Sequence, residues 1–233
     1  MRMTRTLEGR TIAVTGGFGA LGRAVGVALA AAGASVVLID KAAAPEAVQP
    51  GVVALGGVDL AQDGAARQAL DQAAARLGGL DGLVNIAGGF HWETVEAGSA
   101  GTWDDLYMRN VRTALLASQG VLPHLLASGR GRIVNVGASA AGAAGLGMGA
   151  YAASKAGVAK LTEAMAEEFK DRGITVNAVL PSIIDTPANR ASMPQSDATR
   201  WVAPDALAQV IVFLVSDAAA PITGALIPVK GRV

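Results

Sequence analysis

The sequence predicts one α/β domain, a doubly wound parallel sheet with helices on both faces. Short apolar runs rich in β-branched residues alternate with alanine-rich stretches along all 233 residues. The runs are continuously apolar, which is typical of parallel strands that are buried on both sides. Hydrophobic residues make up 52% of the chain and charged residues 16%, a balance that excludes a disordered protein. Because no internal repeat or low-complexity linker divides residues 1–233, we expect a single domain.

The pattern of the first 77 residues predicts, in order, a strand, a helix, two strands and a second helix. TIAVT at 11–15 has the pattern of a buried strand. The alanine-rich segment 20–32 favours a helix that a glycine ends, and SVVLI at 35–39 supplies the next strand. A short strand within 51–58 and a helix over 63–77 follow.

The second part continues this alternation with longer helical stretches. We expect, in order, a strand at 82–86, a helix at 102–127, a strand at 132–136, a helix at 150–171, a strand at 174–180, a helix at 205–216 and a strand at 225–229. The connection over 181–204 carries four prolines and no clear helical pattern. Long loops at the carboxyl ends of strands often close over a substrate, so we expect a substrate loop near 187–204.

Charge and residue usage exclude several classes of function. The chain has 19 basic and 19 acidic residues, so no basic excess indicates binding to nucleic acid or to an anionic membrane. It has no cysteine, which excludes disulfides and thiolate metal sites and fits a cytoplasmic location. The first ten residues lack the apolar stretch of a signal peptide, and the longest apolar stretch, 24–39, is too short to span a membrane. The two histidines lack the spacing of metal ligands, so we expect no metal.

A glycine-rich turn, TGGFGALG at 15–22, joins the first expected strand to the first expected helix. Glycines in such a turn let the backbone approach a pyrophosphate, and the helix N-terminus presents free N–H groups to that anion. Asp40 closes the second strand, where a carboxylate can accept hydrogen bonds from both hydroxyls of an adenosine ribose. The same carboxylate repels a 2′-phosphate, so the pattern favours NADH over NADPH, although Lys41 could soften the repulsion.

The segment YAASK places Tyr151 and Lys155 four residues apart in an expected helix, and residues at this spacing share one helix face. A neighbouring ammonium favours phenolate, so we expect the pKa of the Tyr151 phenol to be lowered. A tyrosine of that kind can act as a general acid or base. Taken alone, such a pair is more often two solvated side chains on a helix surface.

These segments are similar in kind and order to those of the short-chain dehydrogenase/reductase family, which the chain resembles over nearly its whole length. The resemblance is carried by TGGFGALG at 15–22, Asp40, VDL at 58–60, NIAG at 85–88, Asn110, Tyr151 with Lys155, and PSIIDT at 181–186. It implies a Rossmann fold, a nicotinamide cofactor and hydride transfer to or from a small-molecule carbonyl, alcohol or quinonoid imine. It also implies a homotetramer, with a homodimer as the next alternative.

The resemblance implies roles for individual residues of this sequence. Tyr151 would exchange the proton with the substrate, Lys155 would hold the nicotinamide ribose, and Asn110 would help to hold a water that relays protons. Ser139 is the candidate for the serine that orients the substrate. The cofactor, NAD with NADH preferred over NADPH, would contact Gly16, Phe18, Gly19, Ala20, Leu21, Asp40, Lys41, Asp59, Leu60, Ala87, Gly88, Tyr151, Lys155, Pro181, Ile184 and Thr186.

The chain departs from the family pattern at several positions. The catalytic serine usually stands thirteen residues before the tyrosine, where this chain has Ala138, and Ser139 stands twelve before it. Either the loop is one residue shorter and Ser139 takes that role, or no serine orients the substrate. Ala20 replaces a glycine of the glycine-rich turn, and Ile86 replaces the second asparagine of an NNAG motif. Ser182 replaces the glycine that usually follows the proline of the last motif.

A narrower resemblance points to the dihydropteridine reductase branch, which also lacks the usual serine and carries an acid that selects NADH. It is carried by AGGFHW at 87–92, GASAAG at 137–142, GMGAYAASKAGV at 147–158 and AVLPSIIDTPANRASMP at 178–194. The substrate would then be a quinonoid dihydropterin. Asn110 instead makes the chain similar to an ordinary carbonyl reductase. A third alternative is an NAD-binding sensor or interaction subunit without catalysis.

Two tryptophans have two interpretations each. Trp92 lies close to the expected place of the nicotinamide, where it would either stack on a flat substrate beside His91 or pack as an ordinary aromatic residue. Trp201 closes the proline-rich connection and would either anchor it or belong to the core.

Overall fold

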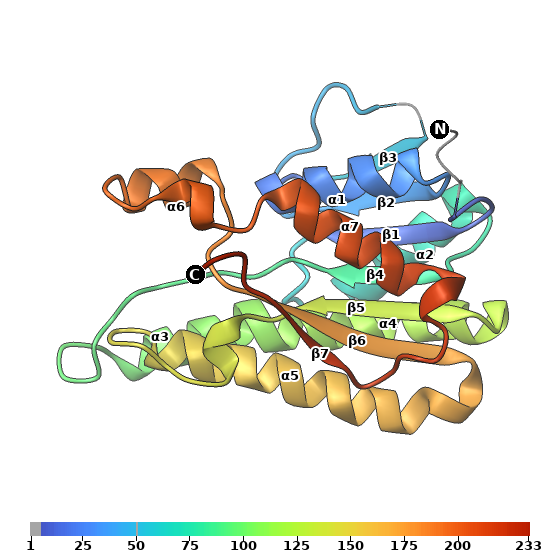
Figure 1. Ribbon diagram of the computed structural model, residues 1–233. Coiled ribbons are helices and arrows are strands. Elements are labelled where there is room, and N and C mark those ends of the chain that lie inside the picture. The colour runs from blue at the N-terminus through green and yellow to red at the C-terminus, as the bar shows by residue number, and fades with distance from the viewer. Residues whose placement is uncertain (1–5, 50) are drawn as a thin grey trace.

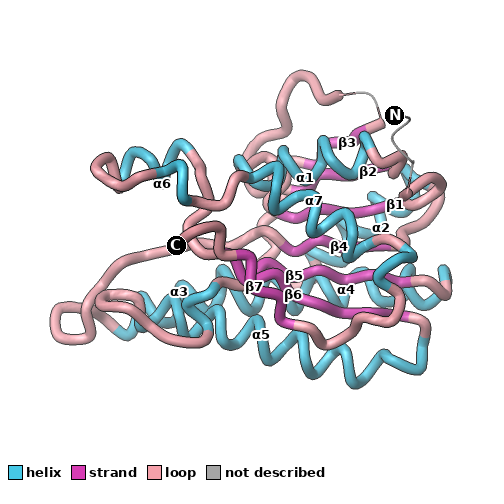
Figure 2. The backbone as a smooth tube through the Cα atoms, in the orientation of Figure 1, coloured by secondary structure: helices cyan, strands magenta, loops and turns pink. Residues whose placement is uncertain are grey.

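The computed structural model describes residues 6–49 and 51–233. At its centre lies a parallel sheet of seven strands in the order β3-β2-β1-β4-β5-β6-β7 (Figures 1 and 2). The strands are β1 (Thr11–Thr15), β2 (Ser35–Ile39), β3 (Val52–Leu55), β4 (Gly82–Asn85), β5 (Gly131–Val136), β6 (Ile174–Pro181) and β7 (Leu226–Val229). The chain winds outward from β1 to β3 and then returns to the other side of β1. The predicted doubly wound parallel sheet is therefore confirmed.

Helices cover both faces of this sheet (Figure 1). They are α1 (Ala20–Ala31), α2 (Ala65–Leu77), α3 (Ala100–Tyr107), α4 (Thr113–Ser128), α5 (Gly149–Phe169), α6 (Pro187–Ser192) and α7 (Pro204–Val215). On one face α1 packs against α7, and Leu29 and Leu207 share a core with Val14 of the central strand. On the other face α2, α4 and α5 form a second core that includes Leu70 and Val121. Apolar burial in these two layers is the main stabilising contribution to the fold.

The helix that the sequence predicts over 102–127 is longer and contains a wider turn. Between α3 and α4 lies a π-helical turn, Met108–Arg112. It brings Asn110 into the interior, where only 1% of that residue is exposed. Such turns occur frequently at functional sites. Apolar periodicity did not reveal this one, because a single π turn shifts the pattern by only one residue.

The connection expected as a loop over 181–204 contains two short helical segments, α6 and a 3₁₀ turn at Ala198–Arg200. Thr186 caps α6 by accepting a hydrogen bond from the Asn189 backbone N–H at 3.2 Å. Trp201 is buried, and Val202 N donates to Ile183 O at 2.9 Å, so the base of the connection is anchored to the body of the protein. Helix α6 escaped detection because it has only six residues and begins with a proline.

The other predicted elements agree with the structure to within two residues at each end, and the short third strand lies inside its expected range. That strand was expected within 51–58 and ends at Leu55, because two glycines follow and Gly57 adopts a φ of +74°. Among the described residues, no helix combines the length and the apolar character that crossing a membrane requires.

Candidate active site

The glycine-rich turn between β1 and α1 has the geometry of an anion cradle. Gly16 has a φ of +64°, and a Cβ there would lie 2.8 Å from Ala87 N. A Cβ on Gly22 would collide with Gly16 O, so both positions require glycine. Helix α1 begins at Ala20 with no side-chain cap, which leaves its first N–H groups free for an anion. Ala20 is exposed, so its methyl group fits where the family has glycine.

Asp40 lies beside this turn with its carboxylate held by backbone groups. Phe18 N donates to Oδ2 at 2.9 Å, and Ala42 N donates to Oδ1 at 3.0 Å. Lys41 Nζ donates to Asp59 Oδ2 at 2.9 Å, and this bond holds the pKa of Asp59 below its usual value. The Lys41 ammonium is therefore paired with a second carboxylate, that of Asp59.

A cleft of about 960 Å³ runs past the turn along the carboxyl ends of the strands. Of the predicted cofactor residues, it is lined by Gly16, Gly19, Ala20, Leu21, Asp40, Lys41, Asp59, Leu60, Ala87, Gly88 and Thr186. The cleft has further lining residues that the sequence analysis did not assign to the cofactor, which are Gly22, Arg23, Val58, Ala61, Ile86, Asp105, Met108, Arg109, Thr113, Pro187 and Ala188. The Phe18 side chain instead lines a separate pocket beside α1. Tyr151, Lys155, Pro181 and Ile184 are not among the lining residues of the cleft.

Lys155 is buried on α5 and lies next to the end of this cleft. Its Nζ donates to Val136 O at 2.8 Å, and burial lowers its pKa from 10.5 to about 8. Gly88 lines the cleft, and a Cβ there would lie 3.6 Å from Lys155 Nζ and would collide with Asn110 Oδ1. Gly88 therefore joins the lining of the cleft to the buried side chains of Lys155 and Asn110.

Tyr151 stands one turn before Lys155 on α5 and is partly buried. Its ring meets the Phe90 ring edge to face, with the centroids 4.9 Å apart. Burial raises the pKa of Tyr151 to about 12. The predicted lowering of this pKa is therefore wrong for the structure, because loss of water outweighs the ammonium, which is hydrogen-bonded to Val136 O. At neutral pH the phenol is protonated and can serve as a proton donor.

Asn110 fixes the π turn to the surroundings of Tyr151. Its Oδ1 accepts from Gly89 N at 2.8 Å, while its Nδ2 donates to Gly89 O at 3.0 Å and to Ser154 Oγ at 2.8 Å. Ser154 Oγ in turn donates to Tyr151 O at 2.8 Å. The sequence analysis missed Ser154, although its position inside YAASK was a usable signal.

In the NIAG segment, Asn85 matches the family motif and makes buried side-chain hydrogen bonds, whereas Ile86, which replaces an asparagine, makes only a backbone hydrogen bond. Asn85 Nδ2 donates to Asn135 Oδ1 at 2.9 Å, and Asn135 Nδ2 donates to Thr162 on α5 at 2.9 Å. Ile86 N donates to Thr15 Oγ1 at 3.1 Å, so that residue is held through its backbone. These bonds tie the phosphate turn, β4, β5 and α5 together in the interior.

Ala138 occupies the position where the family usually has a serine, and Ser139 follows it. Ala138 is buried, whereas Ser139 opens a 3₁₀ turn and is half-buried. This turn packs against α5. The position thirteen residues before Tyr151 thus holds the buried methyl group of Ala138, and the neighbouring hydroxyl group belongs to Ser139.

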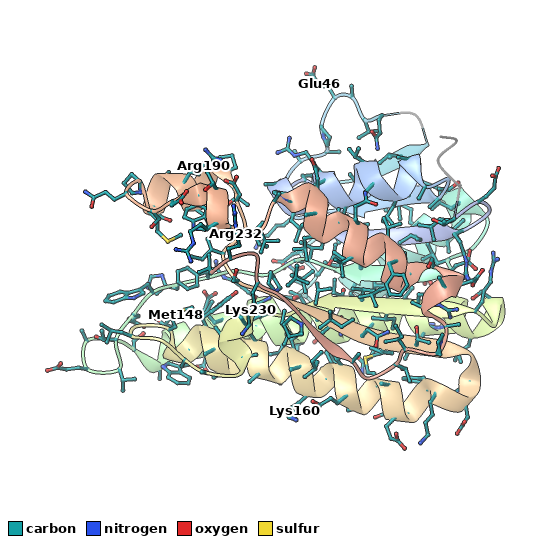
Figure 3. All side chains as sticks on the ribbon, in the orientation of Figure 1. Glu46, Met148, Lys160, Arg190, Lys230 and Arg232 are labelled. Carbon is teal, nitrogen blue, oxygen red and sulfur yellow. The ribbon has the colours of Figure 1, made fainter. Side chains whose placement is uncertain are left out.

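Ser182, the substitution in the last motif, ties the end of β6 to the C-terminal segment. Its Oγ donates to Lys230 O at 2.6 Å, and Arg200 Nη2 donates to Arg232 O at 2.7 Å. Ile184 O accepts from Asn189 Nδ2 at 2.8 Å, while the Thr186 hydroxyl caps α6. Buried Pro181 ends β6. These residues hold the base of α6, and Arg190 of α6 and Arg232 are labelled in Figure 3.

Comparison with known proteins agrees with the fold and the motifs. The family model for short chain dehydrogenases matches residues 10–197. 2-(S)-Hydroxypropyl-CoM dehydrogenase 3 of Xanthobacter autotrophicus is 34% identical over 98% of this chain and 98% of its own. An inactive 2-(S)-hydroxypropyl-CoM dehydrogenase 2 of the same organism is 36% identical over 86% of this chain and 95% of its own. The structure of a short-chain dehydrogenase/reductase from Serratia marcescens is 32% identical and covers 97% of this chain and 98% of its own, with a TM-score of 0.89. The chain therefore belongs to the short-chain dehydrogenase/reductase family, whose members are oxidoreductases.

Proposed function

We propose that the protein is an NADH-dependent oxidoreductase that reduces a small-molecule carbonyl or quinonoid imine, or oxidises the corresponding alcohol. The observation that carries this proposal is the continuity of one site. The phosphate turn lines the cleft together with Gly88, and a Cβ on Gly88 would lie 3.6 Å from Lys155 Nζ and would collide with Asn110 Oδ1. The residues fit a dinucleotide, because they offer glycine cradles, free helix N–H groups and a carboxylate at the ribose position.

Each residue has a task in this proposal. The nicotinamide, when bound, supplies a hydride to the electrophilic carbon of the substrate. Tyr151 donates its phenolic proton to the substrate oxygen or nitrogen, which completes the reduced product, and regains a proton from water. Lys155 holds the nicotinamide ribose, and its ammonium stabilises the negative charge that develops on Tyr151. Asn110 and Ser154 hold the π turn against the first turns of α5.

A panel of carbonyl compounds tests the function. We expect NADH oxidation, followed at 340 nm, with at least one member of a panel that contains simple ketones, diketones and a quinonoid dihydropterin. Preferential turnover of the dihydropterin would support the narrower alternative, a dihydropteridine reductase. Ala138 is consistent with this alternative, because that branch also lacks the usual serine. Tight NADH binding without any turnover would contradict the proposal. It would favour the alternative of a non-catalytic NAD-binding sensor or interaction subunit, and one relative of this chain is described as inactive.

Replacing Asp40 with alanine tests the preference for NADH. The wild-type protein is expected to bind NADH at least about tenfold more tightly than NADPH, because the carboxylate bonds to ribose hydroxyls and repels a 2′-phosphate. Asp40→Ala should narrow this gap, as measured by fluorescence titration of both cofactors. Lys41→Ala is the matched control and should leave NADH preferred. Equal affinities of the wild-type protein for the two cofactors would refute the assignment.

Replacing Ser139 with alanine tests whether Ser139 or no serine orients the substrate. If the half-buried hydroxyl reaches the substrate oxygen, Ser139→Ala should lower kcat/KM about tenfold, close to the effect of one lost hydrogen bond. We expect this loss, because Asn110, Tyr151 and Lys155 preserve the rest of the proton-transfer set. An unchanged kcat/KM would remove Ser139 from the site and strengthen the dihydropteridine reductase alternative.

We further propose a homotetramer, with a homodimer as the next alternative. Trp103 and Tyr107 of α3 and the adjoining Met108 are substantially exposed, and an apolar face of this kind is typical of a subunit contact. Light scattering at micromolar concentration should give about four times the chain mass of 23.3 kDa. A particle of the monomer mass would contradict the proposal.

A further inference from the structure

Three exposed apolar side chains lie in the segments that follow β4 and precede α5, and we call them the aromatic wall. They are Phe90, Trp92 and Leu146, with exposed fractions of 57%, 54% and 82%. Phe90 and Trp92 follow β4, and Leu146 lies in the segment before α5. In Figure 1 both segments extend to the left of the sheet, on the same side as α6. Met148, labelled in Figure 3, marks the end of the second segment.

The two segments are joined by specific contacts. Trp92 Nε1 donates to Leu146 O at 2.9 Å, and Glu93 N donates to Gly147 O at 2.9 Å. Gly147 has a φ of +69°, and any Cβ there would collide with the Trp92 indole. The indole therefore lies directly on the Gly147 backbone. Its polar atom is satisfied and its orientation is fixed, so the wall is formed before a substrate arrives.

One member of the aromatic wall, Phe90, contacts the proposed proton donor, Tyr151. The Phe90 ring stands at 81° to the Tyr151 ring, with the centroids 4.9 Å apart. Because the two rings are in contact, a substrate that accepts the Tyr151 proton binds in the neighbourhood of the Phe90 ring. None of the three wall side chains carries a charge. Large apolar side chains that are exposed, fixed and adjacent to a reactive group are typical of a binding surface for an apolar ligand.

We infer that the substrate of this site carries an aromatic ring, or an equally broad flat apolar group, close to the carbonyl or imine group that is reduced. This inference rests on the proposed function. The alternative occupant of the aromatic wall is a second copy of the chain, which would leave the site without a preference for aromatic substrates.

A pair of diketones that differ by one substituent tests the inference. 1-Phenyl-1,2-propanedione carries a phenyl group where butane-2,3-dione carries a methyl group. We expect kcat/KM to be at least about tenfold higher for the phenyl compound, because its ring leaves water for the wall. Phe90→Ala should reduce this ratio at least about threefold. Phe213→Ala, which removes an exposed phenylalanine from α7, is the matched control and should leave the ratio unchanged. A ratio of one or below in the wild-type protein would overturn the inference.

A binding measurement separates this inference from the proposed function. Benzamide and acetamide resemble carbonyl substrates but are not reduced, so calorimetric titration of the NADH-loaded protein measures binding alone. We expect at least about tenfold tighter binding of benzamide, and a smaller difference in Phe90→Ala. Equal binding of the two amides overturns the aromatic wall even if diketones are reduced. Tighter binding of benzamide without turnover of any carbonyl compound would support the wall and contradict the proposed function.

Discussion

Replacement of Tyr151 with phenylalanine is expected to lower kcat by about 10²–10⁴-fold, the usual effect of losing a general acid. The change removes only the hydroxyl group. The ring contact with Phe90 and the backbone bond from Ser154 remain, so the fold and the affinity for NADH should be retained. The measurement is kcat for NADH oxidation, together with fluorescence titration of NADH and a thermal unfolding scan of both proteins.

The matched control for this variant is Tyr107→Phe. The chain has two tyrosines, and Tyr107 lies at the exposed end of α3 and is not one of the residues that line the cleft. Tyr107→Phe should retain the wild-type kcat. A fully active Tyr151→Phe would contradict the proposed mechanism, because reduction would then proceed without the phenolic proton of Tyr151.

Lys155→Ala is expected to lower kcat by at least about tenfold and to weaken NADH binding as well. Two effects combine, since the ammonium is proposed to hold the nicotinamide ribose and to stabilise charge on Tyr151. Lys155→Met, which keeps most of the side-chain volume, should show the same losses and so exclude an effect of the cavity alone. Lys160→Ala on the same helix is the control, because Lys160 is exposed and pairs only with Glu163 among the described residues. Unchanged NADH affinity in Lys155→Ala would contradict the proposed ribose contact.

The pH dependence of the wild-type protein should carry the same signature. Burial lowers the pKa of Lys155 to about 8, so its charge is present below this pH and is lost as the pH rises through it. The value of kcat/KM for reduction should therefore fall above about pH 8. This limb should be absent from Lys155→Met. A limb that persists in that variant would show that another group titrates there.

The fold and much of the candidate site were predictable because their signals are local. The strands are continuous apolar runs, and the phosphate turn, Asp40 and the pair Tyr151 and Lys155 each lie in a short segment with a physical reason for its residues. Asp40 meets the turn because a parallel sheet places the end of β2 beside the end of β1.

Other features depend on contacts between segments distant in the chain. The π turn is required by the bonds of Asn110 to Gly89 and Ser154, which no periodicity records. The pKa of Tyr151 was predicted in the wrong direction because burial could not be read from YAASK. The fixation of Trp92 depends on Gly147, which lies more than fifty residues further along the chain.

Transfer of a label from the cofactor tests the central claim most directly. In a single turnover with NADH that carries deuterium at C4 in the transferable position, the protein is incubated with the most active ketone of the carbonyl panel and the product is analysed by mass spectrometry. The proposed function predicts an alcohol with one deuterium on the reduced carbon, formed far more slowly by Tyr151→Phe. The labels at the two faces of C4 are supplied separately, so that either stereochemistry is detected. Alcohol without deuterium from either label, or no alcohol although the protein binds NADH, would contradict the account.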